Sequence, residues 1–132
     1  MKKPVYSKLY EAVDDGAARA KAADREWKAL FSDLEARGQL TDQRKRIVDR
    51  LVRERVEYEF LAPDVAAEGA VKKGPNGGDV FNFKWSALQK VKDQILKLET
   101  ALGLIVDKGS AGIAPPSKKT KASKYLDRLG SN

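Results

Sequence analysis

The sequence predicts an all-α fold, a helical hairpin or bundle interrupted by one small β-hairpin. Three observations predict it. Apolar residues recur every three or four positions over long stretches, 34% of the 132 residues are charged, and a Gly- and Pro-rich segment at residues 74–78 separates two helical regions. Apolar residues at that spacing line one face of an amphipathic helix. A charged fraction above the usual range is typical of long, solvated helices.

The length fits one domain with a segment on either side. We expect an N-terminal segment over residues 1–15, a helical domain over 16–104 and a flexible basic tail over 105–132. The chain has no Cys and no His, so it lacks disulfides, thiolate chemistry and the commonest general base and metal ligand. No apolar run approaches the about 20 residues of a membrane span, and no signal peptide is recognisable. We expect a soluble intracellular protein.

The first half of the chain predicts one short and two long helices. Residues 4–13 predict the short helix, and residues 17–37 have a composition that favours a long one. Gly38 is a suitable C-terminal stop, and Thr41 is a suitable N-cap for the next helix. That helix is expected to reach about residue 62, where Pro63 should end or kink it. The apolar face of the first long helix is Ala20, Ala23, Trp27, Leu30, Phe31 and Leu34, and that of the second is Ile47, Val48, Leu51, Val52, Val56, Phe60 and Leu61.

The Gly-rich segment, within KKGPNGGDVFNFKW at residues 72–85, raises the question of a phosphate-binding loop. Such a loop needs a GxxxxGK[ST] pattern that opens a helix, and that pattern is absent, as is GxGxxG. Asn76-Gly77 between two short β-favouring pieces is instead a strong hairpin signal. The sequence therefore predicts a β-hairpin or turn at residues 70–83 and no nucleotide site.

The last predicted helix runs from about Trp85 to Leu102, with Gly103 just past its end. Its apolar residues repeat at spacings of three and four, which is an a/d seam. A seam of this kind packs within one subunit or forms an interface between copies, and both interpretations remain open. Its residues are Trp85, Leu88, Val91, Ile95, Leu98 and Leu102.

No catalytic constellation is recognisable. A nucleophile–His triad cannot be built without His. Carboxylate-only metal sites are possible, but most Asp and Glu residues lie beside Lys or Arg on helical faces, which favours solvated ion pairs. We expect neither metal nor cofactor, and no enzymatic activity.

A row of basic side chains is the first candidate for binding a polyanion. Arg46, Arg50 and Arg53 fall at i, i+4 and i+7, on one helical face, and Arg44 and Lys45 extend it. A row of guanidinium groups can contact successive phosphates. The alternative is that this helix forms the i, i+4 pairs Arg50–Glu54, Arg53–Glu57 and Arg55–Glu59.

The tail is the second candidate. Residues 107–132 hold six Lys or Arg and two Asp or Glu, which is over half of the net charge of +7. Flexible lysines give non-specific, salt-sensitive attraction to DNA. A tail that serves only solubility is the alternative. The tail lysines are Lys118, Lys119, Lys121 and Lys124.

The order of these elements resembles the small subunit of bacteriophage terminases over about residues 22–104. The pieces that carry the resemblance are ADREWKALFSDLEARGQLT, DQRKRIVDRLVRERVEYEFLAPDVAAEG, AVKKGPNGGDVFNFKW and SALQKVKDQILKLETALGL. The family commonly has Asn-Pro before the last helix, where this chain has NFKW, and a Pro-, Ser- and Arg-containing segment after LGL, where this chain differs. Any role of that basic segment therefore does not carry over.

The resemblance implies a ring-forming protein that binds double-stranded viral DNA in the host cytoplasm and regulates the terminase large subunit, which owns the catalysis. It assigns the seam to assembly, the basic row and tail lysines to DNA, and residues 110–132 to the large subunit. One alternative is a monomeric or dimeric helix-turn-helix regulator built around Gly38–Thr41. Another is a structural adaptor that binds only protein.

Overall fold

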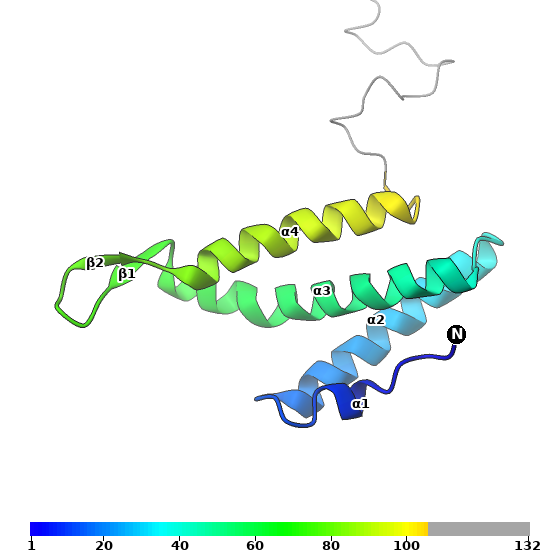
Figure 1. Cartoon of the computed structure of the whole chain (residues 1–132), viewed down its shortest axis with the longest axis horizontal. Helices are drawn as coiled ribbons and strands as arrows, with labels where there is room; N and C mark the ends of the chain where they lie inside the picture. Colours follow the sequence, from blue (N-terminus) through cyan, green and yellow to red (C-terminus); the bar gives the residue numbers. More distant parts are fainter. Residues whose placement is uncertain (106–132) are drawn as a thin grey trace, which may run out of the picture.

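Helices dominate the computed structural model, which describes residues 1–105 (Figure 1). The middle of the three long helices packs against both others, and the short first helix packs on the second. A mostly helical chain with one small β-hairpin is confirmed, whereas residues 106–132, with the four candidate lysines of the tail, lie outside the described residues. The elements are α1 (Tyr6–Leu9), α2 (Gly16–Ala36), α3 (Asp42–Glu68), β1 (Val71–Lys73), β2 (Asp79–Phe81) and α4 (Phe83–Ala101).

The predicted helix ends are confirmed at three positions. The Thr41 hydroxyl accepts a hydrogen bond from the Arg44 backbone N–H at 3.1 Å, as an N-cap does. Gly38 and Gly103 have φ of 64° and 72°, the left-handed conformation that closes a helix at low cost for glycine. In both cases the residue after the glycine donates its N–H back into the last helical turn.

The predicted helix end at about residue 62 was wrong, because α3 continues through Pro63 to Glu68, over residues for which the sequence predicted only a further turn. Proline has no N–H, so the carbonyl of Glu59 loses its normal helical donor. The continued helix buries Val65, which is 7% exposed, and the Gly69 N–H closes its last turn on the Val65 carbonyl at 2.7 Å. Burial of an apolar side chain thus offsets the lost hydrogen bond.

The main core is a single apolar cluster in which α3 is central. It contains most of the predicted apolar faces of α2 and α3, and Tyr6 joins it from α1. Phe31, Ile47 and Phe60 are partly buried against it, and Leu61 of the predicted face is not part of it. From α4 only Leu102 is fully buried in it, while Ile95, Leu98 and Leu104 pack against it. The buried residues are Tyr6, Ala20, Ala22, Ala23, Trp27, Leu30, Leu34, Val48, Leu51, Val52, Val56 and Leu102.

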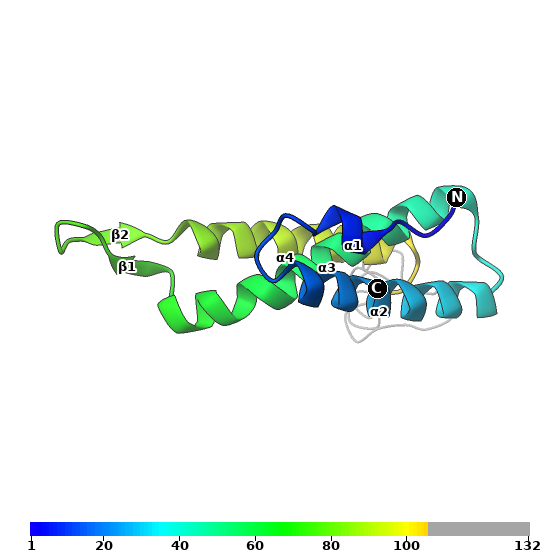
Figure 2. The ribbon, with the colours of Figure 1, turned by 90° about the horizontal axis from the view of Figure 1, so that it is seen from below.

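The ends of α3 and α4 that flank the hairpin extend beyond α2 in both views (Figures 1 and 2). We call residues 65–91 the distal arm. Val65, Leu88 and Val91 are buried there but lie outside the main cluster. The distal arm is therefore a two-helix layer that no third helix of the described chain covers.

The hairpin closes through a three-residue loop, Pro75 to Gly77. The Gly74 N–H donates to the Gly78 carbonyl at 2.7 Å, and the Gly77 N–H donates to the Gly74 carbonyl at 3.0 Å. Gly77 has φ of 78°, as expected for the last residue of such a loop. The strands pair antiparallel with Val71 opposite Phe81. The predicted hairpin is confirmed, and the loop connects strands instead of opening a helix.

Asn82 joins the hairpin to the helices and is 1% exposed. Its side-chain NH₂ donates to the Gly69 carbonyl at 2.7 Å, and its side-chain oxygen accepts from the Lys84 N–H at 3.1 Å. Asn82 is thus the N-cap of α4. This explains why α4 begins at Phe83, two residues before the predicted start.

Tyr6 anchors the N-terminal segment to α3 through a partly buried hydrogen bond. Its hydroxyl donates to Asp49 Oδ1 at 2.9 Å, and its side chain is 1% exposed. Burial, followed by the bond to Asp49, raises the pKa of Tyr6 above the ordinary value of 10.0. The folded protein therefore holds this proton at pH values where the unfolded chain releases it.

Tyr6→Phe should lower the free energy of unfolding by about 1 kcal/mol at neutral pH. Because the folded-state pKa is raised, the contribution of Tyr6 is complete below pH 10.0 and is lost as the pH rises above it. The stability difference between wild type and variant should therefore narrow above that pH. Urea unfolding on both sides of pH 10.0 measures it, and Tyr58→Phe, at a more exposed site, is the control. A difference that stays constant with pH would contradict this role.

Arg55 links the three long helices. Its Nη1 lies 3.0 Å from Glu26 Oε2 on α2, and its Nη2 lies 3.4 Å from Glu99 Oε2 on α4. All three side chains are partly buried, so removal of the guanidinium would leave two carboxylates near each other with reduced solvent screening.

Arg55→Ala should destabilise the fold by about 2 kcal/mol, less than the loss of a fully buried pair because water still reaches these groups. Arg25→Ala is the matched control. Its 2.8 Å pair with Glu59 is exposed and should contribute less than about 1 kcal/mol. Chemical denaturation of both variants measures the difference, and equal losses would disprove the bridging role.

Candidate nucleic-acid interface and assembly surface

The solvent-facing side of α3 carries the predicted basic row. Val48, Leu51 and Val52 turn into the core, so positions half a turn away face water. Arg46, Arg50 and Arg53 are all exposed there. The placement of the row on one exposed helical face follows from the 3.6-residue period of the helix.

The three arginines of the row differ in their partners. Arg53 binds Asp49 through two bonds of 3.1 Å each, from Nε to Oδ1 and from Nη2 to Oδ2. Within residues 1–105, Arg46 and Arg50 have no ion-pair partner. The free positive charge of the row thus comes from two guanidinium groups, because Asp49 balances the third.

The two residues that extend the row are engaged elsewhere. Arg44 is half-buried. Its Nη1 donates a hydrogen bond at 3.3 Å to the carbonyl of Leu102, which is the C-cap residue of α4. Lys45 lies 3.7 Å from Asp42 and 5.7 Å from the ring centre of Phe31. Both side chains stabilise the fold at the α2–α3 turn, and neither is as free for a ligand as Arg46 or Arg50.

The alternative i, i+4 pairs do not form. Glu57 accepts from Arg19 of α2 at 3.2 Å, and Glu59 accepts from Arg25 at 2.8 Å. Arg55 binds Glu26 and Glu99, as described above. Glu57 and Glu59 are thus paired with α2. The i, i+4 pair that does form within α3 is Asp49–Arg53, with the acid N-terminal as the helix favours.

The a/d seam of α4 packs within the subunit. Leu88, Val91 and Leu102 are buried, and Ile95 and Leu98 are half-buried against the main core. This is the intramolecular interpretation of the seam. Trp85, at 37% exposure, is the seam residue with the most free surface. Use of the seam between copies stays a prediction, and the buried side chains have little surface to contribute to it.

An aromatic cluster that sequence reasoning missed lies where β2 meets α4. We call Phe81, Phe83 and Trp85 the aromatic patch. Their exposures are 48%, 81% and 37%, and the Phe81 ring packs edge-on against Phe83 at 6.2 Å and Trp85 at 5.9 Å. Val71 and Val80 of the hairpin are exposed nearby in sequence. The sequence signal that could have indicated this patch is the aromatic residue at every second position, 81, 83 and 85.

Two further kinds of functional feature, a metal site and a membrane-spanning helix, are absent from the described residues. Among residues 1–105, no group of three His, Cys, Asp or Glu side chains could hold a metal ion. In the same range, no helix is long and apolar enough to cross a membrane.

Comparison with known proteins gives one match. A model of the family described as "Phage terminase, small subunit" matches residues 23–108. No curated protein and no solved structure matches the chain significantly. The matched range covers more than half of the chain, from within α2 past the end of α4.

Proposed function

Since this chain belongs to the phage terminase small subunit family, we propose that it binds double-stranded viral DNA and regulates the terminase large subunit during genome packaging. The proposed working form is a homo-oligomeric ring in the host cytoplasm, without catalytic activity of its own. The family match is the observation that carries this proposal, and the described residues offer one candidate surface for DNA binding and one for assembly.

The DNA-binding surface is the exposed face of α3. Arg46 and Arg50 have no ion-pair partner among the described residues, so neither must break a bond to meet a phosphate. Arg53 follows one turn later but must share its charge with Asp49. Contacts of this kind bind the DNA backbone and do not read base sequence. Lys118, Lys119, Lys121 and Lys124 stay proposed as a second DNA contact.

The assembly surface is the aromatic patch on the distal arm. Exposed apolar surface that is contiguous and rimmed by polar residues is typical of interaction sites. The distal arm is also only two helices thick, so a neighbouring copy would supply the missing layer. This assigns assembly to Phe81, Phe83 and Trp85 more than to the buried part of the predicted seam. Residues 110–132 stay proposed as the contact with the large subunit.

Native mass spectrometry combined with a DNA titration tests the proposal. A single species above the tetramer, which binds duplex DNA with an affinity that falls steeply with salt, is the expected result. A monomer or dimer would favour the helix-turn-helix regulator. A large oligomer without affinity for DNA would favour the structural adaptor.

A further inference from the structure

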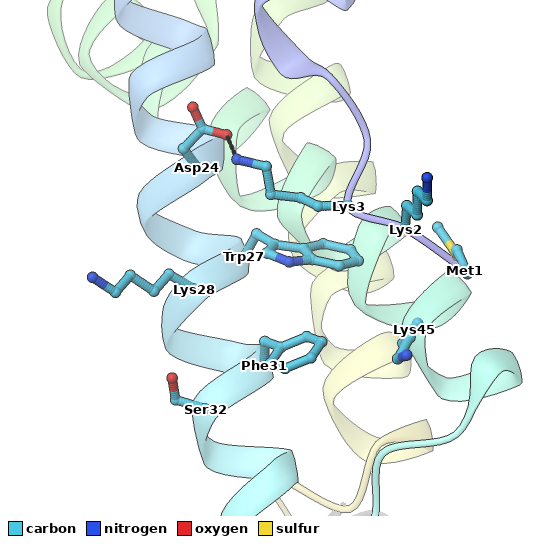
Figure 3. Close-up of a pocket in the computed structure, with 9 residues that line it drawn as sticks. All are labelled: Met1, Lys2, Lys3, Asp24, Trp27, Lys28, Phe31, Ser32 and Lys45. Carbon is cyan, nitrogen blue, oxygen red and sulfur yellow. Dashed lines mark hydrogen bonds and ion pairs between the residues drawn. The ribbon is translucent and has the colours of Figure 1, made fainter.

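A groove separate from the basic row and the aromatic patch lies between the N-terminal segment, α2 and the start of α3 (Figure 3). Its volume is about 610 Å³, within the range of small-molecule and peptide pockets. The function proposed above does not use it. Its lining residues are Met1, Lys2, Lys3, Asp24, Trp27, Lys28, Phe31, Ser32 and Lys45.

The floor of the groove is aromatic and rigid. Trp27 is 5% exposed and packs against Phe31 with ring centres 6.1 Å apart. On its other side Trp27 packs edge-on against Tyr6 at 6.5 Å, and the Tyr6 hydroxyl is bound to Asp49. Phe31 is only partly buried. The contacts of Trp27 with Tyr6 and Phe31 fix the position of these rings, so the apolar surface is preformed. Phe31 is its accessible ring.

The rim of the groove is positively charged. Four of the nine lining residues are Lys and one is Asp. Asp24 is bound to Lys3 at 2.7 Å, and Lys45 lies 3.7 Å from Asp42. Among residues 1–105, Lys2 and Lys28 have no ion-pair partner. Two ammonium groups thus remain unneutralised at the edges of the groove, and the Lys28 side chain extends outward from α2, away from the Trp27 and Phe31 rings (Figure 3).

We propose that this groove docks an acidic peptide segment of a partner protein through an aromatic or branched aliphatic anchor residue. The anchor packs on Phe31, and carboxylates that flank it meet the free ammonium groups of Lys2 and Lys28. An apolar anchor in a pocket with a complementary charged rim is a common design of peptide-binding sites.

Other occupants fit the groove less well. Duplex DNA presents phosphates and base edges, and its exposed apolar group, the thymine methyl, lies within the major groove, where it cannot enter between Trp27 and the N-terminal segment. The chain's own residues 107–132 hold six basic and two acidic side chains, so their charge repels that of the rim. A second copy is proposed above to assemble through the aromatic patch on the distal arm, which contributes no residue to this groove.

Fluorescence anisotropy with the full chain tests the proposal. The probe is a short fluorescein-labelled peptide of Glu and Asp with Leu and Phe at helical spacing. It should bind the wild type, and a matched peptide with Ser in place of Leu and Phe should bind at least about tenfold more weakly because the anchor is lost. A matched peptide with Gln in place of the acids should also bind more weakly.

Lys28→Glu should weaken binding of the probe by about tenfold or more, because it turns an attraction at the rim into a repulsion. Lys28 is exposed and unpaired within residues 1–105, so the fold should be unaffected. Lys92→Glu on α4 makes the same charge change on another face and should leave binding unchanged. The proposal is overturned if Lys28→Glu and Lys92→Glu weaken binding of the probe equally, or if the Ser peptide binds as well as the probe. It is also overturned if duplex DNA displaces the probe from the wild type but not from Lys28→Glu.

Discussion

Replacing Phe83 with Asp is expected to convert the assembled protein into smaller species while each subunit keeps its helices. Phe83 is 81% exposed, so within the subunit the substitution removes little packing beyond the edge-on contact with the Phe81 ring. It is also the first residue of α4, where a negative charge is favourable to the helix. In an interface the same change loses about 2 kcal/mol of apolar burial and adds the larger cost of a buried carboxylate. Each subunit contact should weaken by about 100-fold or more.

Native mass spectrometry together with far-ultraviolet circular dichroism measures this effect. Lys90→Asp, at an exposed position of the same helix, is the control for added negative charge and should retain the full assembly. An intact assembly in Phe83→Asp would remove the aromatic patch from the interface. Ile95→Asp, the substitution that the a/d seam suggests, is a poorer test. Ile95 packs against the main core, so its replacement should lower helicity as well as assembly.

Replacing Arg46 and Arg50 together with Ala is expected to weaken DNA binding strongly and to flatten its dependence on salt. Each phosphate contact contributes about 0.9 to the slope of log K against log salt concentration. The double variant should therefore lose nearly two units of slope for each subunit that touches the DNA. Arg53→Ala should have a smaller effect, because Asp49 already holds that guanidinium through two bonds of 3.1 Å. Titrations of a labelled duplex at several salt concentrations measure these differences.

The matched control is Lys90→Ala combined with Lys92→Ala, which removes the same charge from α4. If the basic row binds DNA, this control should change neither the affinity nor the slope by a comparable amount. Equal effects of the two double variants would mean that only net charge matters. A separate variant with Ala at Lys118, Lys119, Lys121 and Lys124 measures the contribution of the tail.

Local signals in the sequence predicted the helix ends well. Thr41, Gly38 and Gly103 act through hydrogen bonds to residues a few positions away, so their roles can be inferred from neighbours in the chain. Pro63 was misjudged because the burial of Val65 outweighs the local preference to end the helix. Asn82 was missed although its cap bond, from the Lys84 N–H, is local; only its second bond, to the carbonyl of Gly69, spans the hairpin.

The candidate sites divide in the same way. The helical period predicted that Arg46, Arg50 and Arg53 share an exposed face. The same period places Asp49 one turn before Arg53, so this pair was accessible to sequence reasoning but was missed. The bond from Arg44 to the carbonyl of Leu102 could not be predicted in this way, because its partner is distant in sequence. The groove over Phe31 also needs the N-terminal segment to fold back on α2, which Tyr6 secures through a residue in α3.

The shortness of the free basic row has a consequence for the lifetime of a DNA complex. Arg46 and Arg50 lie about 6 Å apart along the helix axis, so one subunit can hold few phosphates. Such a contact breaks often. In an assembly, however, neighbouring subunits keep the DNA at a high effective concentration until the broken contact forms again. Avidity of this kind can exceed the single-site affinity by about 100-fold or more. The DNA should therefore remain bound as a whole while each contact exchanges quickly, and Phe83→Asp should shorten the residence time without altering any residue that touches DNA.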